Sequence, residues 1–138
     1  MNQKKILVVD DSAFTRNYHA SLLRGAGFQC VTAVDGMDAL EKVMLEQFDA
    51  IITDINMPGV DGYELTRRVR DIAEYDDTPI LIVSTEAKED DRAKGYELGA
   101  DFYLVKPVGP AEVVEGLKMV LGSKEPGERN TSQGISKH

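Results

Sequence analysis

Short aliphatic runs alternate along this chain with segments of helical periodicity, and this alternation restricts the possible fold more than any other feature. Four runs are clear, at residues 6–9, 50–52, 80–83 and 102–105. Runs that are short, apolar throughout and rich in β-branched residues are typical of strands buried on both faces of a parallel sheet. A weaker run at residues 30–34 is interrupted by Thr32 and suits an edge strand.

Between the runs, apolar residues recur at the spacing of an amphipathic helix. The pattern predicts helices that include residues 13–24, 37–44, 65–72 and 113–121, while residues 88–98 form a weaker candidate with many charges. In the first helix, Phe14, Tyr18 and Leu22 are spaced by four residues, and Asp61 with Glu64 resembles a helix N-cap and its return partner. Five strand-helix units imply an α/β fold, with a doubly wound parallel sheet and helices on both faces.

Length and composition place this fold in one domain. The chain has 138 residues, and its segment 122–138 is mostly polar, so we expect a domain over 1–121 followed by a disordered tail or linker stub. No apolar run approaches the roughly 18 residues of a membrane span. The single cysteine, Cys30, fits a reducing compartment and a cytoplasmic location. The net charge of −8 disfavours direct binding of nucleic acid.

Polar residues follow four of the five predicted strands at the point where each strand ends. Asp10 and Asp11 follow the first strand, Asp54 follows the third, Ser84 ends the fourth and Lys106 follows the fifth. Ligands of open α/β sheets bind outside the carboxyl ends of the strands. We therefore expect three carboxylates, a hydroxyl and an ammonium group to converge at one edge of the sheet.

Three carboxylates in one cleft repel each other unless a cation joins them. An all-oxygen site favours a hard ion such as Mg²⁺, which would let an anionic phosphoryl group approach. Asp54 could then act as a nucleophile that forms an acyl phosphate. Taken singly, each residue has a plainer interpretation. Asp10 and Asp11 could cap a helix, Asp54 could belong to a turn, Ser84 could be an N-cap and Lys106 could be a solvated surface lysine.

Four motifs in this chain resemble the receiver domain of bacterial two-component response regulators. They are VVDD at 8–11, TDINMPGVDG at 53–62, STEA at 84–87 and GADFYLVKP at 99–107. The resemblance covers about residues 4–121 and includes a similarity to the single-domain chemotaxis response regulator. It implies a flavodoxin-like fold with strand order 2-1-3-4-5 and a cis bond between Lys106 and Pro107.

The same resemblance implies roles for the residues at the strand ends. Asp54 would accept a phosphoryl group from a sensor histidine kinase or a histidine phosphotransfer protein. Asp11, Asp54 and the backbone carbonyl of Asn56 would coordinate Mg²⁺, with Asp10 acting through water. Lys106 would contact the phosphoryl oxygens.

Further residues would convert phosphorylation into a signal. By the resemblance, Ser84 is the switch hydroxyl and Tyr103 the switch aromatic, although a half-buried strand aromatic is an equally good interpretation of Tyr103. Asn56 and Glu86 would gate the access of water to the acyl phosphate and so set its lifetime. The fourth helix, fifth strand and fifth helix would present a surface to a downstream protein. We place His19 on the surface of the first helix.

On this interpretation the chain is a switch that promotes its own phosphorylation and dephosphorylation at Asp54 and is not a turnover enzyme. The main alternative is a receiver fragment of a larger, multidomain regulator. A metal-dependent phosphatase would want a second aspartate at position 56, where this chain has Asn56. A flavin carrier would want a hydroxyl-rich loop where Asp10 and Asp11 stand, and there is no glycine-rich nucleotide loop.

Overall fold

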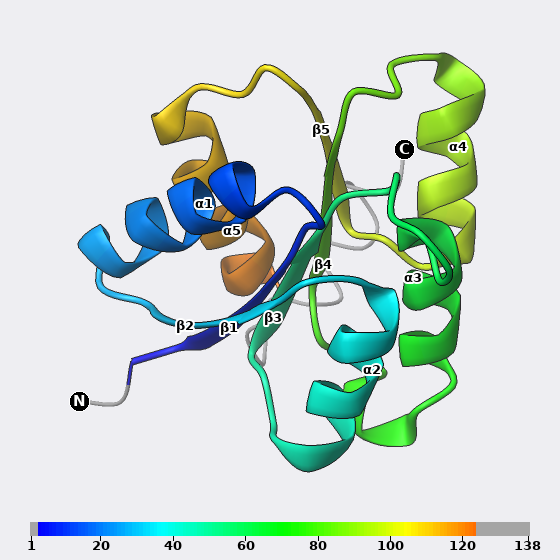
Figure 1. Cartoon of the computed structure of the whole chain (residues 1–138), viewed down its shortest axis with the longest axis horizontal. Coiled ribbons are helices and arrows are strands. Elements are labelled where there is room, and N and C mark those ends of the chain that lie inside the picture. The colour runs from blue at the N-terminus through cyan, green and yellow to red at the C-terminus, as the bar shows by residue number, and fades with distance from the viewer. Residues whose placement is uncertain (1–2, 124–138) are drawn as a thin grey trace.

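The computed structural model describes residues 3–123, and strands alternate with helices throughout them (Figure 1). A short 3₁₀ turn, Ala73–Tyr75, precedes the fourth strand. The elements are β1 (Lys5–Val9), α1 (Ala13–Gly25), β2 (Gln29–Ala33), α2 (Gly36–Leu45), β3 (Ala50–Thr53), α3 (Gly62–Arg70), β4 (Ile80–Ser84), α4 (Glu89–Leu98), β5 (Phe102–Val105) and α5 (Pro110–Ser123).

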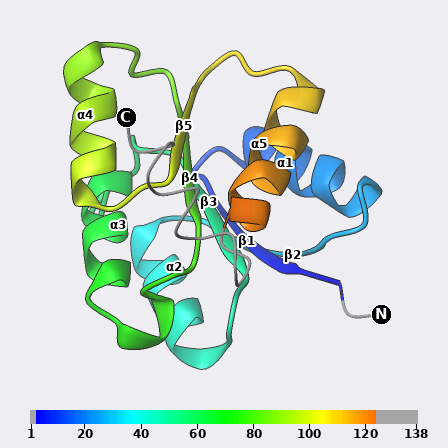
Figure 2. The same cartoon turned by 180° about the vertical axis from the view of Figure 1, so that it is seen from behind.

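The five strands form one parallel sheet in the order β2-β1-β3-β4-β5, as predicted. In register, Val8 of β1 pairs with Ile52 of β3, which pairs with Leu81 of β4. Figures 1 and 2 show α1 and α5 on one face of the sheet and α2, α3 and α4 on the other. The weaker fifth run forms β2, which lies at the edge of the sheet and pairs only with β1.

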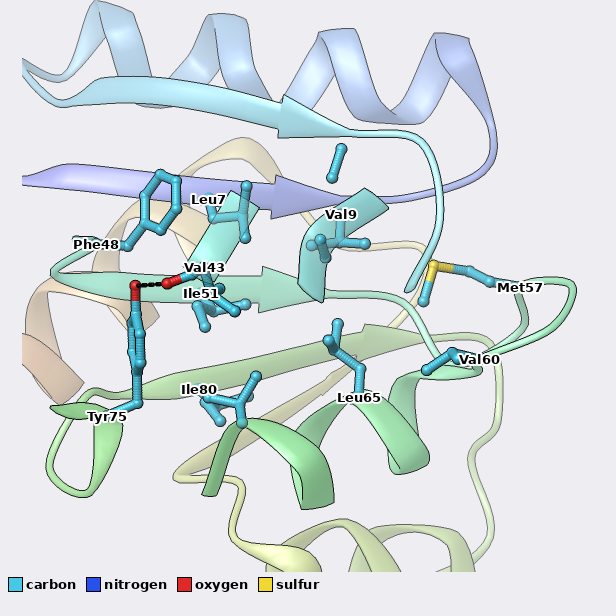
Figure 3. Close-up of a cluster of buried hydrophobic side chains, with 13 residues drawn as sticks. Leu7, Val9, Val43, Phe48, Ile51, Met57, Val60, Leu65, Tyr75 and Ile80 are labelled. Atoms are coloured by element: carbon cyan, nitrogen blue, oxygen red, sulfur yellow. Dashed lines mark hydrogen bonds between the residues drawn. The ribbon is translucent and has the colours of Figure 1, made fainter. Parts of the chain in front are cut away.

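The side chains of the strands point alternately to the two faces, and each face carries its own core. Leu7 and Val9 of β1 pack with α2 and α3, in the cluster drawn in Figure 3. Ile6 and Val8 point the other way and pack with α1 and α5. The central strands are therefore apolar on both faces, which is why they appear in the sequence as continuous aliphatic runs.

The buried face of the first helix differs from the predicted one. Phe14 is 82% exposed and Tyr18 is exposed as well, while α1 packs on the sheet through His19, Ala20 and Leu23. The prediction that His19 lies on the surface is therefore wrong. It failed because the buried face combines His19 and Ala20 with Leu23, and a search for large apolar residues at helical spacing passes over the first two.

In α2 the exposed residues include Met37 and Met44, and the buried ones are Gly36, Ala39 and Val43. The last helix, α5, runs to Ser123, two residues beyond the predicted domain boundary. The rest of the predicted tail, 124–138, lies outside the described residues. Among residues 3–123, no helix combines the length and the apolar character that crossing a membrane requires.

Candidate functional site

The end of β1 delivers two carboxylates to the carboxyl edge of the sheet. Asp10 is buried, and its Oδ1 accepts a 2.9 Å hydrogen bond from the backbone N–H of Ser12, which fixes the turn into α1. Ser12 is itself the N-cap of α1, since its Oγ accepts from Thr15 N. Asp10 and Asp11 are therefore not needed as helix caps, and Asp11 stays exposed at the mouth of the site.

The end of β3 places Asp54 beside them. The Asp54 N–H donates to Val9 O of the neighbouring strand at 3.1 Å, and its Oδ1 accepts a 2.7 Å bond from Ile55 N. Two glycines shape the loop that follows. Gly59 has φ +75°, a conformation that favours glycine. Gly62 approaches so closely that a Cβ there would lie 2.1 Å from the Asp54 carbonyl oxygen.

Asp10, Asp11 and Asp54 form one acidic cluster, in which a ligand atom of each lies within 4.8 Å of the others. The Lys106 ammonium, carried by the loop after β5, bonds Oδ2 of Asp10 at 3.2 Å and Oδ2 of Asp54 at 3.3 Å. Burial raises the pKa of the Asp54 carboxyl, and the nearby Lys106 charge partly offsets this. The Lys106–Pro107 peptide bond is cis.

This donor set suits a hard divalent ion. The three carboxylates bring more negative charge than one ammonium can balance, and carboxylate oxygens are the ligands that Mg²⁺ takes in proteins. A site with one exposed and two buried carboxylates also leaves coordination positions open to water or to a phosphoryl oxygen. The residues present therefore fit the predicted ion.

Ser84, at the end of β4, lies in a second, connected group of polar contacts. It is fully buried, and its Oγ accepts a 3.1 Å bond from Glu86 N. The N-cap of α4 is Lys88, so Ser84 does not cap that helix. The Glu86 carboxylate accepts a 3.0 Å bond from the side-chain amide of Asn56, which joins the loop after β4 to the loop after β3.

Tyr103 points into the domain from β5 and is 3% exposed. Its hydroxyl donates a 2.7 Å bond to the carbonyl of Glu86, and its ring packs against Gly95 of α4. Burial raises the pKa of the Tyr103 phenol, whereas hydrogen bonding that includes the Ser84 hydroxyl lowers it. Ser84 and Tyr103 thus both bind the backbone of Glu86.

Two residues near the site were not predicted. Arg16 of α1 donates a 2.8 Å bond from its guanidinium to the Asp10 carbonyl and so ties α1 to the acidic loop. Buried His19 lies close enough to Lys106, Asp10 and Asp54 for their charges to shift its pKa. The spacing of His19, Ala20 and Leu23 could have indicated the buried face, but nothing in the sequence signals the Arg16 contact.

The chain was also compared with known proteins. A family model for the response regulator receiver domain matches residues 6–118. The transcriptional regulatory protein PrrA of Mycobacterium tuberculosis is 40% identical over 135 residues, which cover 96% of this chain and 56% of PrrA. The chain thus spans about half the length of PrrA and of similar transcriptional regulators.

Two solved structures resemble the fold closely. The chemotaxis protein CheY4 of Vibrio cholerae has a TM-score of 0.83 and 39% identity, covering 86% of this chain and 99% of CheY4. The receiver domain of sensor histidine kinase PA1611 from Pseudomonas aeruginosa, solved with a magnesium ion in its active-site cleft, has a TM-score of 0.81 and 30% identity and covers 88% of this chain and 100% of that domain. The family match, these similar structures and the geometry of the acidic edge together show that the chain belongs to the receiver domain family of two-component response regulators.

Proposed function

We propose that this chain is a phosphorylation-dependent switch in which Asp54 accepts a phosphoryl group from the phosphohistidine of a sensor histidine kinase or of a histidine phosphotransfer protein. One observation carries the proposal. Asp54 belongs to a cluster of three carboxylates, with the Lys106 ammonium 3.3 Å from its Oδ2. A cation-binding cluster and a fixed positive charge beside one carboxylate are what an incoming phosphoryl group requires.

The reaction is a transfer between two nucleophiles. A carboxylate oxygen of Asp54 attacks phosphorus, the phosphorus–nitrogen bond breaks, and the donor imidazole leaves and takes up a proton from water. Asp11, Asp54 and the carbonyl of Asn56 would hold Mg²⁺, with Asp10 acting through water, and the ion would neutralise charge on the phosphoryl oxygens. The similar receiver domain of PA1611, solved with magnesium in its cleft, supports a magnesium site in this chain.

Lys106 and Ser84 are proposed to hold the phosphoryl oxygens that the metal leaves free. Lys106 already spans Asp10 and Asp54, so it needs only a short movement to contact a group on Asp54. Ser84 is buried and bound to Glu86 N, so turning toward a phosphoryl group would loosen the segment that Tyr103 also holds. Tyr103 is therefore proposed as the residue that passes the change to the surface.

The proposed output surface is formed by α4, β5 and α5, where a downstream protein would bind the phosphorylated form. Asn56 and Glu86 are proposed to control the lifetime of the acyl phosphate, because their hydrogen bond joins two loops beside Asp54. The chain would then act as a timed switch rather than as a turnover enzyme. A cytoplasmic location and the absence of direct nucleic-acid binding remain predictions.

A second candidate is a receiver that works as part of a larger regulator. The observation that favours it is the coverage of PrrA, of which this chain matches about half. The nearly complete coverage of CheY4 is expected of a receiver with or without further domains. The site chemistry is the same in both cases, and only the route from the switched surface to the output differs.

Intact-mass measurement after incubation with Mg²⁺ and acetyl phosphate tests the proposal. We expect a Mg²⁺-dependent phosphoryl adduct on the wild-type protein and none on Asp54→Asn. Lys118→Met, at an exposed lysine of α5, is the matched control and should form the adduct normally. If Asp54→Asn carried the adduct as the wild type does, the phosphoacceptor assignment would be wrong.

A further inference from the structure

Helix α4 has few apolar contacts with the rest of the domain. Among its residues, all of which the structure describes, only Gly95 is buried, while Arg92, Lys94 and Tyr96 are exposed. Buried apolar area supplies most of the free energy that holds a surface helix in place. The position of α4 must therefore depend to an unusual degree on polar and aromatic contacts, each weak enough to break.

Tyr63 of α3 makes two of these contacts. The residue is 9% exposed, and its hydroxyl donates a 3.0 Å hydrogen bond to the carbonyl of Asp91, in the first turn of α4. The Lys94 ammonium lies 4.4 Å from the centre of the Tyr63 ring. The Asp91 carboxylate in turn accepts from Lys88 N at 3.1 Å and so caps the helix. Tyr63 thus binds the residue that establishes the start of α4.

Tyr63 is also joined to the proposed switch residue. Tyr63 and Tyr103 belong to one buried cluster with Ile82, and burial raises the pKa of both phenols. Their hydroxyl groups lie close enough for each to affect the pKa of the other. Tyr103 holds Glu86 just before α4, and Tyr63 holds Asp91 just inside it. Two adjacent phenols therefore fix the segment that leads from Ser84 into α4.

We propose that Tyr63 is a positioning residue, whose hydroxyl holds the first turn of α4 against α3 and thereby keeps Tyr103 in its buried orientation. The consequence for signalling rests on the proposed function, in which Tyr103 is the switch aromatic. Without the hydroxyl, Tyr63 holds the start of α4 through its ring contact with Lys94 alone, and Tyr103 leaves its buried position more readily.

Tyr63→Phe isolates this role, because it removes the hydroxyl and keeps the ring under Lys94. Tyr75→Phe is the matched control. Tyr75 is also a buried phenol that donates to a helix carbonyl, at 3.1 Å to Val43 O of α2, but it lies at the opposite edge of the sheet (Figure 3). The Tyr75 hydroxyl donates to two carbonyls and the Tyr63 hydroxyl to one, so a general loss of stability should be at least as large in Tyr75→Phe.

The readout is fluorine NMR of the full chain labelled with 3-fluorotyrosine, in which the Tyr103 signal is assigned by its loss in Tyr103→Phe. Before phosphorylation, Tyr63→Phe should shift or broaden the Tyr103 signal. It should also speed amide exchange in α4 by roughly three- to tenfold, the factor expected from one lost hydrogen bond. Tyr75→Phe should leave the Tyr103 signal where the wild type has it.

Two outcomes would overturn the inference. One is a Tyr103 signal and an α4 exchange rate that are unchanged in Tyr63→Phe. The other is an equal change in Tyr75→Phe, which would point to general destabilisation. Both comparisons use the unphosphorylated protein, so they stand whether or not Asp54 accepts a phosphoryl group. Failure of the proposed function would appear separately, as a wild-type protein that forms no adduct with Mg²⁺ and acetyl phosphate.

Discussion

The ammonium of Lys106 lies 3.3 Å from Oδ2 of Asp54, so one fixed positive charge already occupies the space beside the proposed phosphoacceptor. The same ammonium contacts Asp10 at 3.2 Å. Burial raises the pKa of the Asp54 carboxyl, and Lys106 opposes that rise by stabilising the ionised form. A divalent ion among the same carboxylates would be repelled by the lysine, even though both would attract a phosphoryl group.

Replacing Lys106 with methionine should therefore separate metal binding from phosphoryl transfer. Removal of the repelling charge should tighten Mg²⁺ binding by roughly five- to tenfold, a factor in keeping with screened charges a few ångströms apart. Loss of the phosphoryl contact should slow adduct formation by at least about tenfold. Calorimetric titration with Mg²⁺ and intact mass with acetyl phosphate measure the two effects. Equal Mg²⁺ affinity in Lys106→Met and Lys118→Met would contradict the first of them.

The hydrogen bond between Asn56 and Glu86 leads to a prediction about the lifetime of the phosphorylated state. Asn56→Met and Glu86→Leu should each slow loss of the phosphoryl group by at least about threefold, a barrier change of at least about 0.6 kcal/mol, because apolar side chains exclude water from the loops beside Asp54. Decay of the adduct mass after removal of the donor measures this. The double variant should be non-additive, since the two residues are in contact. Glu89→Leu, at an exposed residue of α4, should decay like the wild type.

The fold and the site were predictable for one physical reason. Parallel strands that are buried on both faces must be apolar throughout, so their ends are marked by the first polar residue. Asp10, Asp54 and Lys106 are far apart in sequence, yet each follows a strand, and all the strands end at one edge of the sheet. Topology alone thus brings together groups that the sequence separates.

The faces of the helices were harder to predict, because burial there depends on the partner. In α1 the sheet accepts His19 and Ala20, and the aromatic pair Phe14 and Tyr18 remains exposed. The contact from Tyr63 to Asp91 crosses from α3 to α4 over 28 residues and has no periodic signal at all. Such contacts depend on where two helices meet, which local pattern does not encode.

Gly62 should tolerate no side chain. A Cβ there would lie 2.1 Å from the Asp54 carbonyl oxygen, and backbone cannot yield as a flexible side chain does. Gly62→Ala should therefore lower the free energy of unfolding by about 3 kcal/mol or more and slow phosphorylation, since the Asp54 loop must shift. Urea denaturation measures the first effect. Gly25→Ala, with no atom within 4 Å of the added carbon, is the control and should lie within about 1 kcal/mol of the wild type. Equal stability of the two variants would show that the loop gives way.

Buried His19 should make the stability of the domain depend on pH. Burial lowers the pKa of the imidazole below 6.5, and the Lys106 charge lowers it further, against the opposing effect of Asp10 and Asp54. Below pH 6.5 the unfolded chain therefore binds a proton at this histidine that the folded chain resists. The contribution of His19 to the free energy of unfolding is fully present above pH 6.5, and it is lost as the pH is lowered toward the folded-state pKa. The slope for one proton is at most about 1.4 kcal/mol per pH unit.

His19→Leu removes the titrating group and fills its buried position with an apolar side chain of similar size. Urea denaturation between pH 7.5 and 5.5, with EDTA present so that no metal alters the neighbouring carboxylates, should show a steeper loss of stability in the wild type than in the variant. Other groups that titrate in this range are common to both proteins, so the difference between the two slopes reports His19 alone. Parallel slopes would mean that the imidazole can be protonated within the fold without penalty.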